Sequence, residues 1–199
     1  MSSQECIVGG NPSSLLDYSN TSTVTIPKGA FSRLFAENTG VVDGSRLTMT
    51  SSPTEFCLSY VFRDCPNLVA GPVFNTSVAK EFFEGFFWNC TGLKTSSELP
   101  ATTLSDVCYS NMYCGCSNLV NAPELPATTL ARQSYYSMFL DCTSLSELVV
   151  YADDISAYIC TDRWLENVAP TGTLHNLGTA VYTTDSPNGI PTGWTETNS

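Results

Sequence analysis

The hexapeptide Leu99-Pro100-Ala101-Thr102-Thr103-Leu104 recurs, residue for residue, as Leu125-Pro126-Ala127-Thr128-Thr129-Leu130. The offset between the two copies is 125 − 99 = 26. Six identical residues at one offset are not expected by chance, and self-similarity at a period of this size is the signature of a repeat architecture.

Positions related by this period carry the same kind of residue around the hexapeptides. A cysteine column and, three residues later, a leucine column run through four units: Cys65, Cys90, Cys116 and Cys142, then Leu68, Leu93, Leu119 and Leu145. Three residues before the cysteines there is an aromatic column: Phe62, Phe87, Tyr113 and Phe139. A single unit of this size cannot bury its apolar face, whereas stacked units share a core. We therefore expect these columns to be structural core.

Within a unit, apolar residues spaced by three and four, such as Tyr109, Met112 and Tyr113, are typical of one or two helical turns. The stretch from Leu119 to Leu125 has apolar ends and a polar middle, which favours a short strand, and its Pro123 excludes a long helix. We predict an α/β-type repeat solenoid of short strands and short helical or 3-10 segments. Each repeat has about 26 residues, and caps close both ends.

The predicted boundaries follow the strength of the repeat. Residues 1–22 are polar and are expected to form an N-terminal arm or cap, residues 23–181 the solenoid, and residues 182–199 a C-terminal cap and tail. Thr23-Val24-Thr25-Ile26-Pro27 is predicted to be the first strand.

Two motifs carry a family resemblance. Phe139-Leu140-Asp141-Cys142-Thr143-Ser144-Leu145 and the repeated hexapeptide resemble the BspA-like class of leucine-rich repeats, from about residue 55 to residue 195. The ending is similar to the cap of such proteins from gut Bacteroidetes, with the motifs Trp164-Leu165, Thr171-Gly172-Thr173-Leu174 and Gly189-Ile190-Pro191-Thr192-Gly193-Trp194. The resemblance implies a surface-displayed solenoid whose strand-lined face binds proteins, glycans or host matrix. Similar repeats in bacteriophage proteins imply an alternative, a tail or head appendage of a virion.

The charge of the chain excludes several classes of partner. The net charge is −11 and the eight Lys and Arg residues are scattered, so no basic patch is available for nucleic acid or for an anionic membrane surface. No apolar run approaches the roughly 20 residues that span a bilayer, so we expect no membrane insertion. The N-terminus lacks the basic and apolar regions of a signal peptide. Three explanations stay open: a signal that was removed, a domain cut from a longer protein, or a protein made and assembled inside a cell, as virion proteins are. The third explanation motivates the virion alternative.

The sequence contains no residue pattern that is typical of a catalytic or metal site. Of the nine cysteines, only Cys114-Gly115-Cys116 comes close to a zinc knuckle, and no second knuckle accompanies it. The one histidine, His175, matches no column and has no evident orienting partner. The adjacent Asp153 and Asp154 are interpreted as a solvated turn rather than a calcium site. We expect no enzyme activity, no metal and no cofactor.

The candidate binding residues are those that vary at a fixed position. One variable column holds Arg63, Trp88, Cys114 and Leu140. A second variable surface follows the predicted strands, with Lys94, Ser96 and Glu98, then Val120, Ala122 and Glu124, then Ser146, Leu148 and Val150. Core columns keep their size and polarity, so variable columns are expected to be exposed and free to contact a partner.

The predicted function is a non-enzymatic binding or adhesion module on a bacterial surface. Its partner is expected to be a protein or glycan surface, with further copies of the chain or virion neighbours as additional contacts. The alternative is a component of a phage virion, and an enzyme that uses Cys or Asp chemistry is the least favoured reading.

Overall fold

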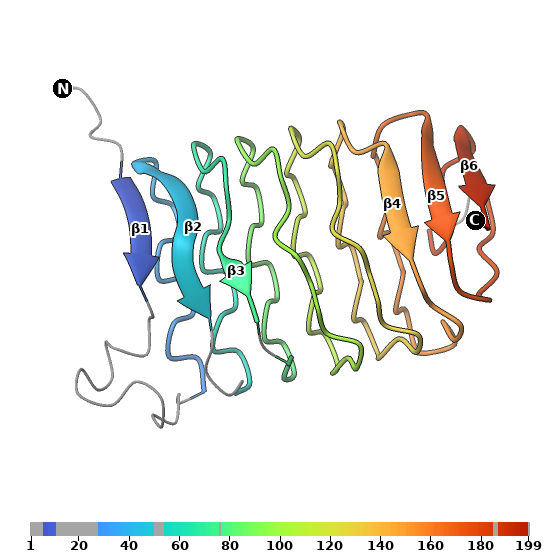
Figure 1. Cartoon of the computed structure of the whole chain (residues 1–199), viewed down its shortest axis with the longest axis horizontal. Coiled ribbons are helices and arrows are strands. Elements are labelled where there is room, and N and C mark those ends of the chain that lie inside the picture. The colour runs from blue at the N-terminus through green and yellow to red at the C-terminus, as the bar shows by residue number, and fades with distance from the viewer. Residues whose placement is uncertain (1–5, 11–27, 50–53, 76, 185–186, 199) are drawn as a thin grey trace.

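The computed structural model describes residues 6–10, 28–49, 54–75, 77–184 and 187–198. The described strands form two parallel sheets at opposite ends of an elongated molecule (Figure 1). The first sheet has the order β1-β2-β3, with bounds Cys6–Gly10, Val41–Met49 and Val73–Phe74. The second has the order β4-β5-β6, with bounds Glu147–Val150, Gly172–Asn176 and Trp194–Thr197.

Single parallel bridges connect the two sheets across the middle of the molecule. They run in register from Asp43 to Ala70, Thr95, Asn121 and Glu147. The sequence steps between successive partners are 27, 25, 26 and 26, which match the offset between the two hexapeptides. The period of the sequence thus marks which residues lie side by side.

Opposite the strands, the described chain runs through six segments of ten residues that consist of consecutive turns: 28–37, 55–64, 80–89, 106–115, 132–141 and 158–167. Every fourth residue of such a segment has a positive φ, as Phe56, Tyr60 and Asp64 do. Within a segment, amides donate to the carbonyl three residues back, as Arg63 does to Tyr60 at 3.1 Å. Other amides donate to the next segment, as Phe62 does to Phe86 at 2.9 Å.

These segments correct the predicted fold class. No helix occurs among the described residues, and regular strands are confined to the two three-stranded sheets, so a repeat solenoid of strands and helical segments is wrong. The spacing of Tyr109, Met112 and Tyr113 is produced by turns of four residues, because the positive φ of Val107 and Asn111 interrupts any helix. The predicted strand at Leu119–Leu125 is reduced to bridges at Asn121 and Leu125.

The core lies between the turn segments and the strand side. Its centre is a column of parallel rings in which Phe62, Phe87, Tyr113 and Phe139 follow one another, with adjacent centroids 5.4–6.0 Å apart. Offset aromatic stacks at such distances contribute attraction beyond the area that they bury. The cysteine and leucine columns flank this stack, and all eight of their residues are fully buried.

Each thiol of the cysteine column donates to a backbone carbonyl of the preceding turn segment. The Sγ–O distances are 3.0 Å from Cys65 to Phe35, 2.9 Å from Cys90 to Phe62, 3.1 Å from Cys116 to Phe87 and 3.0 Å from Cys142 to Tyr113. Cysteine therefore fills this column as a small apolar residue that also satisfies one buried acceptor.

Each of the two predicted terminal regions contributes one strand to a sheet. Strand β1 lies inside the segment expected to be a polar arm, and strand β6 continues the second sheet through the expected cap. The first strand predicted at residues 23–27 lies outside the described residues.

Candidate binding surface

Two arginines and two aromatic rings meet on the turn side near the N-terminal end, and we call Arg33, Tyr60, Arg63 and Trp88 the turn-side patch. The Arg33 guanidinium lies 5.6 Å from the centre of the Tyr60 ring. The Arg63 guanidinium lies 6.0 Å from the Tyr60 ring and 5.7 Å from the Trp88 ring. The two rings are 6.1 Å apart. These distances fall within the range of cation–π attraction.

Three successive turn segments position this patch. Hydrogen bonds between segments fix their register, with the Phe35 amide 2.9 Å from the Val61 carbonyl and the Asp64 amide 2.8 Å from the Trp88 carbonyl. Gly85 makes room for the central ring, since a Cβ at that position would lie 2.3 Å from Tyr60 Cε1. The patch is therefore assembled from three segments that follow one another at the period of the repeat.

The ionisable groups of the patch differ in their charged neighbours. Burial raises the pKa of Tyr60 well above its usual range, and the neighbouring Glu84 carboxylate raises it further. Burial likewise raises the pKa of Glu84, while the Tyr60 hydroxyl lowers it. Arg63 donates from Nε to Asp64 at 2.9 Å, whereas no carboxylate in the described part of the chain forms an ion pair with Arg33. The Arg33 guanidinium is therefore available to an acceptor on a partner.

The patch offers the residue types that dominate binding energy at interfaces. Trp, Tyr and Arg are enriched among interface hot spots because they bury a large area and still carry polar groups at their ends. Tyr60, Arg63 and Trp88 are half-buried and Arg33 is exposed, so a partner could bury them further.

The variable column that includes Arg63 and Trp88 is not exposed along its length. Cys114, the next member, is buried with 5% of its surface accessible, and Leu140 is half-buried. The structure brings Arg63 and Trp88 together and leaves Leu140 two segments away from Trp88. The uniform exposure expected for this column is therefore wrong.

The predicted strand-side residues lie on the other side of the molecule from the turn segments. Lys94, Val120 and Ser146 each directly precede one of the bridged residues Thr95, Asn121 and Glu147, so they form a row. Lys94 and Val120 are exposed and Ser146 is half-buried, while Glu98 and Glu124 are exposed. Because turn segments and bridges lie on opposite sides of the core, the predicted residues do not form a single surface (Figure 1).

The third set of predicted strand residues, Ser146, Leu148 and Val150, does not share one exposed face as predicted. Leu148 and Val150 are each 1% exposed and belong to the core. The reason is that the register of the pairing changes by one residue along this stretch. Asn121 pairs with the residue 26 positions later, Glu147, whereas Leu125 pairs with the residue 25 positions later, Val150.

Sequence reasoning missed Arg33 and Tyr60. Their contacts cross between turn segments, and neither residue belongs to the variable column that contains Trp88. A usable signal was present, since Arg33 precedes Tyr60 by close to one period of the repeat.

His175 has the partners that the sequence did not show. Its Nε2 lies 3.2 Å from Glu147 Oε1 and its Nδ1 lies 3.1 Å from Thr197 Oγ1, so three neighbouring parallel strands supply the three groups. Asp153 and Asp154 are exposed; Asp153 accepts from the amide and hydroxyl of Thr179, and Asp154 from the Ser156 amide. No group of three or more His, Cys, Asp or Glu side chains suited to a metal ion occurs among the described residues.

Comparison of the chain with protein-family models, with curated proteins and with solved structures finds no match. Membership of the BspA-like family, display on a bacterial surface and the virion alternative therefore stay predictions. The described residues include no helix that could span a lipid bilayer.

Proposed function

We propose that this protein is a non-enzymatic binding module, displayed on a bacterial surface, whose turn-side patch contacts a protein or a glycan. The observation that carries the proposal is the cluster of Arg33, Tyr60, Arg63 and Trp88 on an accessible face, in which each side chain lies within 6.1 Å of a neighbour. Such a cluster is preorganised, so few rotamers are lost when a partner buries it.

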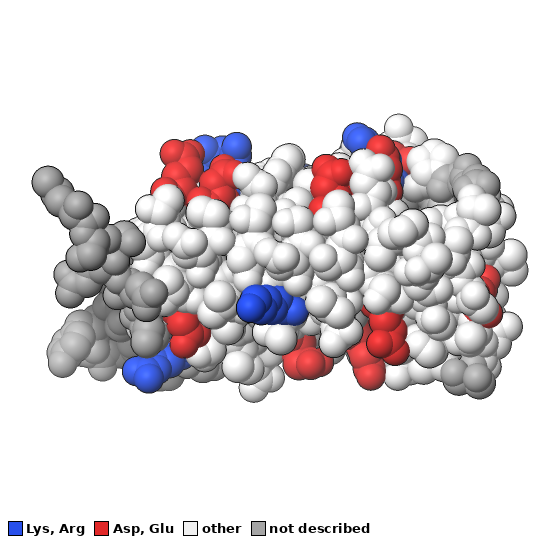
Figure 2. Space-filling view, turned by 90° about the horizontal axis from the view of Figure 1, so that it is seen from above, with Lys and Arg blue, Asp and Glu red and all other residues white. Residues whose placement is uncertain are grey.

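The charge distribution favours a protein or glycan over a nucleic acid. The net charge is −11, and on the face seen in Figure 2 the Lys and Arg side chains lie in separate groups, most of them beside Asp or Glu. A nucleic acid needs a continuous basic surface to replace its counterions. A guanidinium next to aromatic rings suits an isolated carboxylate or carbonyl of a protein or a glycan.

The test measures binding with and without the central aromatic residue. The labelled chain is screened on an array of bacterial and host glycans and purified matrix proteins, and the strongest ligand is then titrated with the wild type and with Trp88→Ala. We expect Trp88→Ala to weaken binding by about 1–2 kcal/mol.

Tyr158→Ala is the matched control, because Tyr158 is an aromatic residue that is 67% exposed and lies outside the patch. It should leave the affinity unchanged. Equal affinities of the wild type and Trp88→Ala would contradict the role of the patch, and tight binding of DNA or RNA would contradict the choice of partner.

A further inference from the structure

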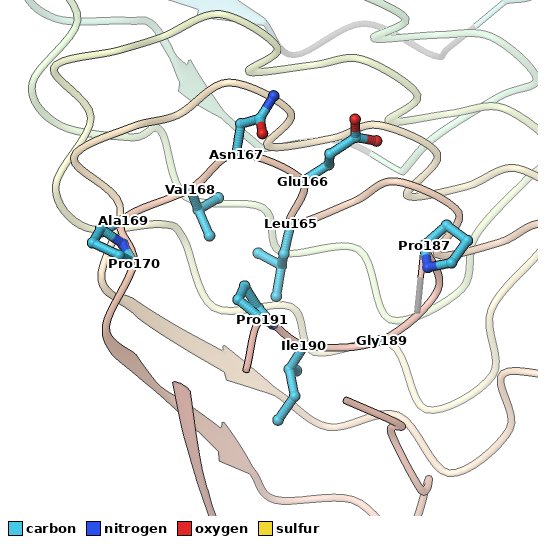
Figure 3. Close-up of a pocket in the computed structure, with 10 residues that line it drawn as sticks. All are labelled: Leu165, Glu166, Asn167, Val168, Ala169, Pro170, Pro187, Gly189, Ile190 and Pro191. Carbon is cyan, nitrogen blue, oxygen red and sulfur yellow. The ribbon is translucent and has the colours of Figure 1, made fainter. Parts of the chain in front are cut away.

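A pocket of about 460 Å³ opens at the C-terminal end of the molecule (Figure 3). Its wall consists of the last turn segment and the following corner, from Leu165 to Pro170, together with Pro187 and residues 189–191. The side chain of Leu165 extends toward Pro191 and Ile190, whereas the Glu166 carboxylate points away from them. The pocket is therefore apolar inside, carries its charged group at the rim and has the size of a small-ligand site.

The pocket takes the place of one missing turn. Strand β4 pairs with β5 at a sequence offset of 26, as Glu147 does with Thr173, whereas β5 pairs with β6 at an offset of 22, as Gly172 does with Trp194. The difference is four residues, and four residues is also the spacing of the positive-φ positions in each turn segment. The last passage of the chain is thus one turn shorter than the passage before it.

Two backbone donors face this pocket. In each turn segment alternate amides donate toward the C-terminal end of the molecule, as those of Phe139 and Asp141 do to the last segment, both at 2.9 Å. The equivalent amides of the last segment belong to Leu165 and Asn167, which line the pocket. No acceptor among the described residues bonds to either amide. A ligand in the pocket is therefore favoured if it supplies an acceptor, because an unmet buried donor costs free energy.

The charges around the pocket favour a neutral acceptor over an anion. Residues 81–199 contain three Lys and Arg and thirteen Asp and Glu, a net charge of −10. On the rim, Arg163 donates from Nε to Glu166 at 2.6 Å, so this guanidinium is already held by a carboxylate. A carboxylate or phosphate in the pocket would be repelled. The matching acceptor is the carbonyl oxygen of a neutral group.

The side chains of the pocket restrict what lies beside that carbonyl. Leu165 and Ile190 are buried apolar residues and Pro191 is half-buried, so the atoms next to the carbonyl should be a small apolar group. Glu166 and Asn167 are exposed at the rim, where carboxylate and amide oxygens suit hydroxyl donors. A methyl group on a neutral carbonyl, attached to a hydroxylated ring, is the acetamido group of an N-acetylhexosamine.

We propose that the C-terminal pocket binds an N-acetylhexosamine residue of a glycan. The acetamido carbonyl accepts from the Leu165 amide, and its methyl group packs against Leu165, Ile190 and Pro191. Ring hydroxyls bond to the Asn167 amide and to the exposed side chains of the rim. The pocket lies three turn segments beyond the one that carries Trp88, so it is a second site, and it rests on the proposed function only in taking the partner to be a glycan.

Amide NMR spectra of the full chain, titrated with N-acetylglucosamine or N-acetylgalactosamine to about 50 mM, test the proposal. The Leu165 and Asn167 resonances should shift and saturate, with a Kd on the order of 1 mM for a ligand of this size. Glucose and galactose, which lack the acetamido group, are the matched control ligands and should leave both resonances in place. Unmoved Leu165 and Asn167 resonances with both N-acetyl sugars, or equal shifts with glucose, would overturn the proposal.

N-methylacetamide separates a sugar from a peptide as the natural occupant. It carries the same carbonyl and methyl group without the hydroxylated ring. We expect it to bind more weakly than either N-acetyl sugar, because it makes no contact with the rim. Binding as tight as that of the sugars would mean that the pocket accepts any amide, and the assignment to a glycan would be wrong.

Pro191→Ala tests the apolar wall. It removes part of the ring that faces Leu165 and keeps the carbonyl that accepts from the Trp194 amide at 2.9 Å. Binding of the sugar should weaken about threefold or more. Pro126→Ala is the matched control, since Pro126 is also half-buried and lies outside the pocket. Equal affinities of the two variants would count against the site.

Trp88→Ala separates this site from the turn-side patch. It should leave the affinity for the N-acetyl sugars unchanged, whatever its effect on a ligand of the patch. Loss of sugar binding in Trp88→Ala, with Pro191→Ala unaffected, would place the sugar on the patch and refute the pocket.

Discussion

Leu119 and Val120 are adjacent in sequence and have opposite surroundings. Leu119 belongs to the leucine column and is fully buried, whereas Val120 directly precedes a bridged residue and is 47% exposed. We expect Leu119→Ala to lower the free energy of unfolding by about 2–5 kcal/mol, because it leaves a cavity in a core shared by neighbouring units.

Chemical denaturation of the variants measures this difference. Val120→Ala serves as the control and should change the free energy of unfolding by less than about 0.5 kcal/mol. Similar losses for both variants would show that burial does not distinguish the two positions.

The thiols are a second residue-scale feature. The eight cysteines whose side chains are described are all buried and unpaired. Burial raises the pKa of Cys114 to about 11 and that of Cys108 to about 12, and it raises the pKa of Cys90 and Cys142 further. A raised pKa keeps a thiol protonated below that pH, and the protonated form is a poor nucleophile.

These eight thiols should therefore react slowly with iodoacetamide at pH 8 in the folded protein. In denaturant without reductant they should react at the rate of an ordinary thiol. Mass spectrometry of the alkylated chain counts them in each state. Rapid labelling of the cysteine column before unfolding, or disulfides found in the denatured chain, would contradict the structure.

At the scale of the element, the turn segments depend on a residue with positive φ at every fourth position. In the five segments after the first, the last such position is occupied by Asp64, Asn89, Gly115, Asp141 and Asn167, with φ between 56° and 76°; in the first segment it is Glu37, with φ 62°. Side chains of this column bond along the stack, with Asn89 Nδ2 2.8 Å from Asp64 Oδ1 and Asn167 Nδ2 2.8 Å from Asp141 Oδ1. At Asn89 and Asn167, a short polar residue therefore offsets the strain of the backbone with a bond to the preceding segment.

Gly115 tests this account because its φ is +76° and an added Cβ would lie 3.3 Å from Asn89 Cα. Gly115→Ala should lower the free energy of unfolding by about 1–2 kcal/mol. Gly115→Asn should cost less, since asparagine tolerates the left-handed region better than alanine. Thermal or urea unfolding of the two variants gives the order, and greater stability of Gly115→Ala would refute the explanation.

At the scale of the whole molecule, repulsion between like charges opposes folding. Most of the net charge of −11 lies in residues 81–199, where the acidic residues outnumber the basic ones by ten. Repulsion of this kind destabilises a compact state and is screened by salt. The exposed ion pair between Lys28 and Glu55 at 2.8 Å adds little to compensate.

Raising the NaCl concentration from about 0.01 M to about 0.1 M should therefore raise the midpoint of thermal unfolding, because the Debye length falls from about 30 Å to about 10 Å. KCl at the same concentrations is the control for specific ion effects and should act equally. A lower midpoint at the higher salt concentration would mean that attractive ion pairs dominate.

Much of the core could be predicted from the sequence. A residue type that recurs once in every repeat, as Cys65 and Cys90 or Leu93 and Leu119 do, must meet the same surroundings in each unit. Packing then restricts its size and polarity. The secondary structure could not be predicted in the same way, because spacings of three and four suit both a helix and consecutive four-residue turns. The choice between them depends on hydrogen bonds to the next unit, whose residues lie a whole repeat further along the chain.

The candidate site, like the fold, could be predicted from the sequence only in part. The sequence alone determined the period, the residues that share a column and the excess of negative charge, since these depend on identity and spacing. Only the tertiary structure decided that Arg33 and Arg63 flank Tyr60, that Leu148 is buried, and that a pocket faces the C-terminal end. These features arise from register between segments, and a shift of one residue or the loss of one four-residue turn changes which side chains meet without altering the periodic pattern elsewhere.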